Sequence, residues 1–129
     1  MPLNVLVVDD EPDIVELFQQ RFRHETRKGE YALRFAHSAD EALQQLDDPA
    51  LPPLGLLLLD INMPGTSGLD LLPRIKRRHP DLPVIMVTAY GDAERRRLGI
   101  ERGASRYLVK PIDFTALKAL MVEVLREPR

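Results

Sequence analysis

The stretch LLLLD at residues 56–60 is the strongest structural signal in this chain, because four leucines run directly into an acidic residue. A short run that is apolar on both faces is typical of a strand covered by helices on both sides of a parallel sheet. Three more apolar runs end in polar residues: VLVVDD at 5–10, VIMVT at 84–88 and YLVKP at 107–111. If all four are parallel strands, their polar ends meet at one edge of the sheet, where open α/β sheets bind ligands.

Segments with a helical period separate these runs. In Pro12–His24, for example, Ile14, Leu17, Phe18 and Phe22 fall on one stripe of a helix. Strands are predicted at Leu3–Val8, Glu30–Ala36, Leu54–Asp60, Pro83–Thr88 and Ala104–Lys110, and helices over 12–24, 38–46, 67–79, 92–102 and 114–124. Ser38, Ser67 and Asp113 are expected to cap three of these helices. Five alternating β–α units predict an α/β protein with one doubly wound parallel sheet and five flanking helices.

Composition limits the possible functions. The chain has 129 residues, of which 44% are hydrophobic, so we expect one domain over residues 1–126 and a tail or the start of a linker at 127–129. A net charge of −2 gives no general attraction to nucleic acid or to an anionic membrane. Without cysteine there are no disulfides or thiolate metal sites. No segment has the form of a signal peptide or a membrane span, which favours a cytoplasmic location.

Three aspartates stand at predicted strand ends. Asp9 and Asp10 alone fit the start of a helix, where acidic residues are favoured. Asp60 changes this interpretation, because three carboxylates at one edge repel one another unless a cation lies among them. Ligation by oxygen alone indicates Mg²⁺, with Mn²⁺ as a possible substitute.

Asp60 is then the candidate nucleophile, since a carboxylate can attack phosphorus and form an acyl phosphate. Lys110 would place a positive charge on a phosphoryl oxygen, and Thr88 would donate a hydrogen bond to another. Taken alone, either residue is more often an ordinary strand-end side chain. The three histidines are expected to be solvated: His24, His37 and His79.

Ordered motifs carry a family resemblance over most of the chain, from about Leu3 to Leu125. They are Val8-Asp9-Asp10-Glu11-Pro12, Asp60-Ile61-Asn62-Met63-Pro64-Gly65 with Gly68, Val87-Thr88-Ala89, and Tyr107-Leu108-Val109-Lys110-Pro111. In this order and at this spacing the chain resembles the receiver domains of bacterial two-component response regulators. The resemblance implies a flavodoxin-like fold with strand order 2-1-3-4-5.

The resemblance also implies a role for each matching residue. Asp60 would accept a phosphoryl group from a histidine, and Thr88 and Lys110 would contact the phosphoryl oxygens. Mg²⁺ would bind Asp10, Asp60 and the backbone carbonyl of Asn62, with assistance from Asp9. Two further roles concern conformation and lifetime: Tyr107 would turn inward when Thr88 moves, and Asn62 and Tyr90 would tune hydrolysis of the acyl phosphate. The Lys110–Pro111 peptide bond is expected to be cis.

By the same resemblance, the partners would be a sensor histidine kinase or phosphotransfer protein and a downstream effector domain or protein. Because Thr88 and Lys110 end the last two strands, the helix over 92–102, the last strand and the last helix should form the face that relays the signal. That face is expected to bind the effector or to pair two receivers. Weak similarity to receivers that precede nucleotide-cyclase domains leaves the output open.

Three alternative functions compete with the interpretation of the chain as a signalling switch. An aspartyl phosphohydrolase would be expected to carry a second acid two residues after its nucleophile, and Asn62 stands there instead. The chain is therefore expected to promote only its own phosphorylation and dephosphorylation. A nucleotide- or flavin-binding module lacks support, since no glycine-rich loop follows the first strand. A degenerate receiver that acts only as a docking module is a further alternative.

Overall fold

A computed structural model describes residues 2–89 and 91–127 and contains one five-stranded parallel sheet. The strands are β1 (Leu3–Val8), β2 (Tyr31–Ala36), β3 (Leu56–Asp60), β4 (Val84–Thr88) and β5 (Arg106–Val109). Their spatial order is β2-β1-β3-β4-β5, which confirms the predicted sheet. In the register, Val8 pairs with Leu59 and Asp60 pairs with Val87, so the carboxyl ends of the central strands lie level.

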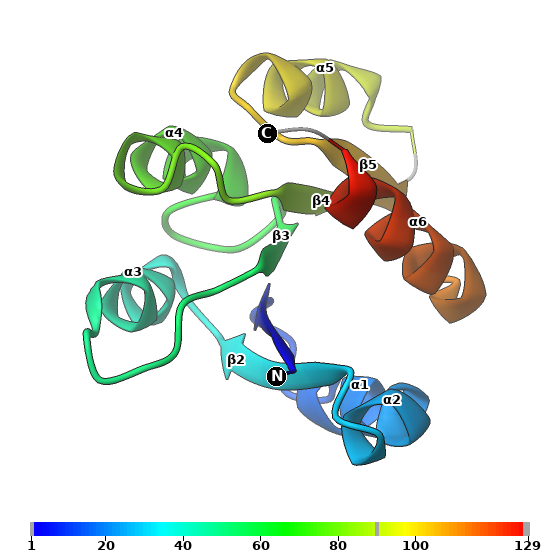
Figure 1. Ribbon diagram of the computed structural model, residues 1–129. Coiled ribbons are helices and arrows are strands. Elements are labelled where there is room, and N and C mark those ends of the chain that lie inside the picture. The colour runs from blue at the N-terminus through cyan, green and yellow to red at the C-terminus, as the bar shows by residue number, and fades with distance from the viewer. Residues whose placement is uncertain (1, 90, 128–129) are drawn as a thin grey trace.

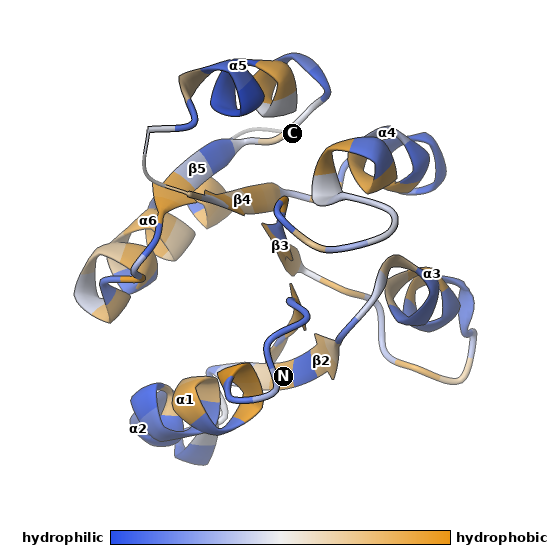
Figure 2. Cartoon of the chain, turned by 180° about the vertical axis from the view of Figure 1, so that it is seen from behind, coloured by the Kyte–Doolittle hydropathy of each residue, from blue (hydrophilic) through white to orange (hydrophobic). Residues whose placement is uncertain are grey.

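Helices cover both faces of the sheet (Figure 1). They are α1 (Ile14–Arg21), α2 (Arg23–Arg27), α3 (Ala39–Asp47), α4 (Gly68–Arg78), α5 (Ala93–Glu101) and α6 (Phe114–Arg126). α1, α2 and α6 lie on one side and α3, α4 and α5 on the other. Each side has its own apolar core, and apolar segments line both sides of the sheet in Figure 2. In the described part of the chain, no helix combines the length and hydrophobicity needed to cross a membrane.

The prediction of five helices was wrong by one, because the first predicted helix is divided at Phe22. The backbone of Phe22 leaves helical geometry, with φ −105° and ψ 12°, and α2 then extends the helical region to Arg27. The Phe22 ring is fully buried and stacks on Phe18 with ring centroids 5.7 Å apart. α2 buries none of its own residues, so it has no apolar stripe from which it could be predicted.

The predicted caps are present. Ser38 and Ser67 accept hydrogen bonds from the backbone N–H groups three residues later, and Asp113 accepts two. Gly103 has a φ of +113° after α5, in the left-handed region where glycine commonly ends a helix. β5 is shorter than predicted, and its first two residues are exposed because it lies at the edge of the sheet.

Candidate functional site

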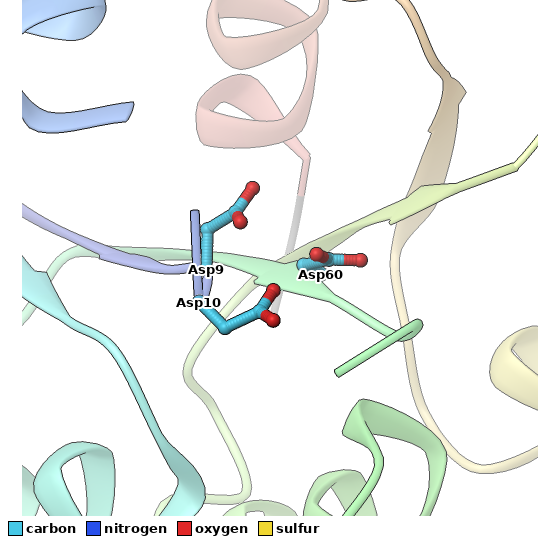
Figure 3. Close-up of side chains that lie close together, drawn as sticks. All are labelled: Asp9, Asp10 and Asp60. Carbon is cyan, nitrogen blue, oxygen red and sulfur yellow. The ribbon is translucent and has the colours of Figure 1, made fainter. Parts of the chain in front are cut away.

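Three carboxylates meet at the carboxyl edge of the sheet. Asp9 and Asp10 follow β1, and Asp60 ends the neighbouring strand β3 (Figure 3). Each offers an oxygen within 4.8 Å of the other two. Because β1 and β3 are adjacent parallel strands with their ends level, the sheet itself brings these side chains together. Asp9, Asp10 and Asp60 therefore lie close together, as their positions at the strand ends predicted.

Burial makes this acidic cluster electrostatically costly. The side chain of Asp9 is 4% exposed and that of Asp60 is 2% exposed. Burial, together with the negative charge of Asp60, raises the pKa of Asp9 from 3.8 to about 6, although the Glu11 N–H donates a 2.9 Å hydrogen bond to it. A divalent cation among these oxygens would remove that cost, so the donor set fits a hard metal ion such as Mg²⁺.

Lys110 extends from the end of β5 into the cluster. Its Nζ donates a 3.1 Å hydrogen bond to Asp60 Oδ2 and lies 3.7 Å from both Asp9 Oδ2 and Glu11 Oε1. Burial alone would lower the pKa of Lys110, but the hydrogen bond to Asp60 and the nearby negative charges outweigh it and raise that pKa. The Lys110–Pro111 peptide bond is cis, as expected. Lys110 is thus a charged contact to the candidate nucleophile.

Thr88 ends β4 and is completely buried. Its Oγ1 has no hydrogen-bond partner among the described residues, which is an unfavourable state for a buried hydroxyl. The Thr88 carbonyl accepts a 2.8 Å hydrogen bond from the Lys110 N–H, so the two residues are joined through the backbone. Ala89, which follows Thr88, is exposed.

The loop after β3 positions Asn62 beside Asp60, where the Asn62 N–H donates a 2.9 Å hydrogen bond to Asp60 Oδ1. Tyr107, the expected switch residue, lies on the outside of β5. It is 44% exposed, and the Arg96 guanidinium lies 5.0 Å from its ring centroid. Tyr90, expected to tune hydrolysis, lies outside the described residues.

Sequence reasoning missed three residues at this edge. Glu11 approaches Lys110, and Arg95 of α5 donates hydrogen bonds to Asn62 Oδ1 at 2.6 Å and to the Ile61 carbonyl at 3.3 Å. His37 was expected to be solvated, which is wrong, since it is half-buried with its Nδ1 3.1 Å from the Asp9 carbonyl. Arg95 lies inside a predicted helix, so the pattern of polar strand ends gave no signal for it. His37 directly follows the predicted strand Glu30–Ala36 and Glu11 directly follows Asp10, so the same pattern could have identified both.

A flavodoxin-like sheet with an acidic cluster at its carboxyl edge defines the structural class, and comparisons with known proteins define the family. The family model described as the response regulator receiver domain matches residues 5–122. The response regulator protein PilR of Pseudomonas aeruginosa is 40% identical over 124 residues, which are 94% of this chain and 26% of PilR. The transcriptional regulatory protein CpxR of Escherichia coli is 37% identical over 122 residues, which are 95% of this chain and 49% of CpxR.

Solved structures agree with this assignment. The receiver domain of NtrX from Brucella abortus superposes with a TM-score of 0.82 at 36% identity, covering 96% of this chain and 99% of that one. A CheY-like receiver domain protein from Methanospirillum hungatei gives a TM-score of 0.85 at 28% identity, covering 97% and 94%. The chain belongs to the response regulator receiver domain family, whose members are signalling switches rather than classic enzymes. It spans about a quarter of PilR and about half of CpxR.

Proposed function

We propose that this chain is a phosphorylation-dependent switch whose Asp60 accepts a phosphoryl group from a histidine of a sensor kinase or phosphotransfer protein. One observation carries the proposal: a carboxylate, an ammonium group 3.1 Å from it and a buried hydroxyl without a partner among the described residues end three adjacent strands. A phosphoryl group on Asp60 would bring acceptor oxygens to Lys110 and Thr88.

We propose that Asp10, Asp60 and the backbone carbonyl of Asn62 hold Mg²⁺, or Mn²⁺ in its place, with assistance from Asp9. Three carboxylates within 4.8 Å of one another support this ligand set, as does the raised pKa of Asp9. When bound, the ion would neutralise charge on the phosphoryl oxygens and on the attacking carboxylate.

In the proposed step, an Asp60 carboxylate oxygen attacks phosphorus and the bond from phosphorus to the donor's imidazole nitrogen breaks. An acyl phosphate forms on Asp60, and the imidazole nitrogen keeps the electron pair of the broken bond. Lys110 contacts both Asp60 and Asp9 before the reaction, and its charge would then shift to a phosphoryl oxygen. Thr88 Oγ1, which has no partner among the residues that the structure describes, would donate a hydrogen bond to another phosphoryl oxygen.

The conformational change caused by phosphorylation would be transmitted to a partner through α5, β5 and α6. Lys110 follows β5 directly, Thr88 ends β4, and a backbone hydrogen bond joins them, so a movement of either residue reaches the other. Tyr107 would turn inward from its exposed position and release Arg96. A shift in the populations of the two conformations from 1:99 to 99:1 needs phosphorylation to change their relative free energy by about 5.5 kcal/mol. Identical amide spectra over residues 88–112 with and without the phosphoryl group would contradict this relay.

A cleft of about 520 Å³ beside the site suits the approach of a phosphodonor protein. It is lined by Ile14 and Leu17 of α1, by Lys110 and by Phe114. We propose that residues 1–126 form the receiver unit in the cytoplasm and that its α5–β5–α6 face contacts an effector or a second receiver. CpxR is named a transcriptional regulatory protein, and an effector of that kind is one possible output.

Incubation with a small phosphodonor and Mg²⁺, followed by intact-mass measurement, tests the core of the proposal. We expect the wild-type chain to gain the mass of one phosphoryl group and Asp60→Asn to gain none. Asp70→Asn is the matched control, because Asp70 is an exposed aspartate on α4. A label that persists in Asp60→Asn would show that the nucleophile is wrongly assigned, and a wild-type chain that gains no mass would favour the docking-module alternative.

A further inference from the structure

Arg95 joins the loop after the phosphoacceptor strand to α5. Its Nη1 donates to Asn62 Oδ1 at 2.6 Å, its Nη2 donates to the Ile61 carbonyl at 3.3 Å, and its Nε lies 3.8 Å from Asp92 Oδ2. The contact also settles the orientation of the Asn62 amide, because a guanidinium has no acceptor and must face the oxygen. Among the described residues, the Asn62 Nδ2 atom has no partner.

The Asn62 oxygen is the one acceptor that this side chain offers beside Asp60. The Asn62 N–H already donates to Asp60 Oδ1, so the side chain is held next to the carboxylate that would carry the phosphoryl group. Water that hydrolyses an acyl phosphate must be oriented toward phosphorus by an acceptor, as amide side chains do in other phosphoryl-transfer sites. Arg95 occupies this acceptor, and its positive charge lowers the basicity of the remaining lone pair.

We propose that Arg95 is a positioning residue that slows hydrolysis of the aspartyl phosphate by holding the side-chain oxygen of Asn62. The inference rests on the proposed function, because it concerns the lifetime of a phosphoryl group on Asp60. It also links that lifetime to α5, since a displacement of this helix would draw the guanidinium away from Asn62. Asp92, at the start of α5, supports the guanidinium from the helix side.

The test is the decay of phosphorylated protein after removal of a small phosphodonor, followed by intact mass in the presence of Mg²⁺. Loss of this hydrogen bond in Arg95→Ala should speed decay by roughly fivefold. Arg95→Lys keeps a donor and a charge and should decay at close to the wild-type rate. Arg97→Ala is the control, because Arg97 lies on the same helix but pairs with Glu94 and Glu101.

A double variant distinguishes an action of Arg95 through Asn62 from a purely structural effect of Arg95 on the fold. If Arg95 acts through Asn62, then Asn62→Ala and the Asn62→Ala/Arg95→Ala double variant should decay at the same rate. In the unphosphorylated protein, Arg95→Ala should also shift the NMR signals of the Asn62 side-chain amide. Wild-type protein that takes no phosphoryl group overturns the proposed function and this inference together. Wild-type protein that is phosphorylated, with Arg95→Ala decaying no faster, overturns this inference alone.

Discussion

Asp9→Asn should stabilise the metal-free protein. The substitution removes a buried negative charge but keeps an oxygen that accepts the Glu11 N–H. The pKa of Asp9 rises from 3.8 to about 6, chiefly through burial and the charge of Asp60. That rise corresponds to about 3 kcal/mol of unfolding free energy lost while Asp9 is ionised. We therefore expect the free energy of unfolding of Asp9→Asn to exceed that of the wild type by about 2–3 kcal/mol at neutral pH.

The pH dependence follows from the direction of this shift. A carboxyl group whose pKa is raised by folding binds its proton more tightly in the folded protein. Its cost is therefore absent below about pH 3.8, grows as the pH rises from about 4 to about 6 and is complete at pH 7.5. Urea unfolding with EDTA at pH 4.5 and pH 7.5 should show a small advantage for Asp9→Asn at the lower pH and the full advantage at the higher one.

Asp13→Asn provides the matched control, because Asp13 is an exposed helix N-cap where asparagine is equally suitable. Its unfolding free energy should stay within about 0.5 kcal/mol of wild type at both pH values. Saturating Mg²⁺ should stabilise the wild-type chain more than Asp9→Asn and so reduce the difference between them. Equal or lower stability of Asp9→Asn at pH 7.5, or a gain that is the same at both pH values, would refute the electrostatic argument.

Three further predictions concern metal binding, the Thr88 hydroxyl and the packing of α5. Mg²⁺ affinity measured by calorimetry should fall as pH drops through about 6, by up to about tenfold per pH unit, because Asp9 takes up a proton there. Thr88→Val removes a buried hydroxyl without a partner among the described residues, so urea unfolding should show equal or higher stability. Amide spectra of this variant should no longer change over residues 88–112 when the protein is phosphorylated. Gly99→Ala should lower the free energy of unfolding by roughly 1–3 kcal/mol in urea titration, because its Cβ would lie 2.0 Å from Met86 Sδ; a stability equal to wild type would contradict that packing argument.

Much of the fold was predictable because its signals are local. Apolar runs such as LLLLD at 56–60 identify buried parallel strands, and Ser38, Ser67 and Asp113 mark helix starts through hydrogen bonds that span two or three residues. The acidic cluster followed from one topological rule, that parallel strands end at a common edge. The division of the first helix at Phe22 was not predictable, because α2 buries no residue of its own.

Gly99 shows how tertiary packing can reverse a local interpretation. From the sequence it is a residue that weakens a helix. In the structure it allows α5 to approach Met86 of β4 more closely than a Cβ would permit. No helical period contains that information, because the partner lies in another element.

Local signals in the sequence specify the strands, their alternation with helices along the chain and the edge at which Asp9, Asp10 and Asp60 meet, since hydrophobic period and strand direction act over a few residues. The burial that raises the pKa of Asp9 to about 6 and the contact between Arg95 and Asn62 arise only from tertiary packing. Both depend on distances between side chains of separate elements. Those distances are set by how helices pack on the sheet, a property of the whole fold that no short segment contains.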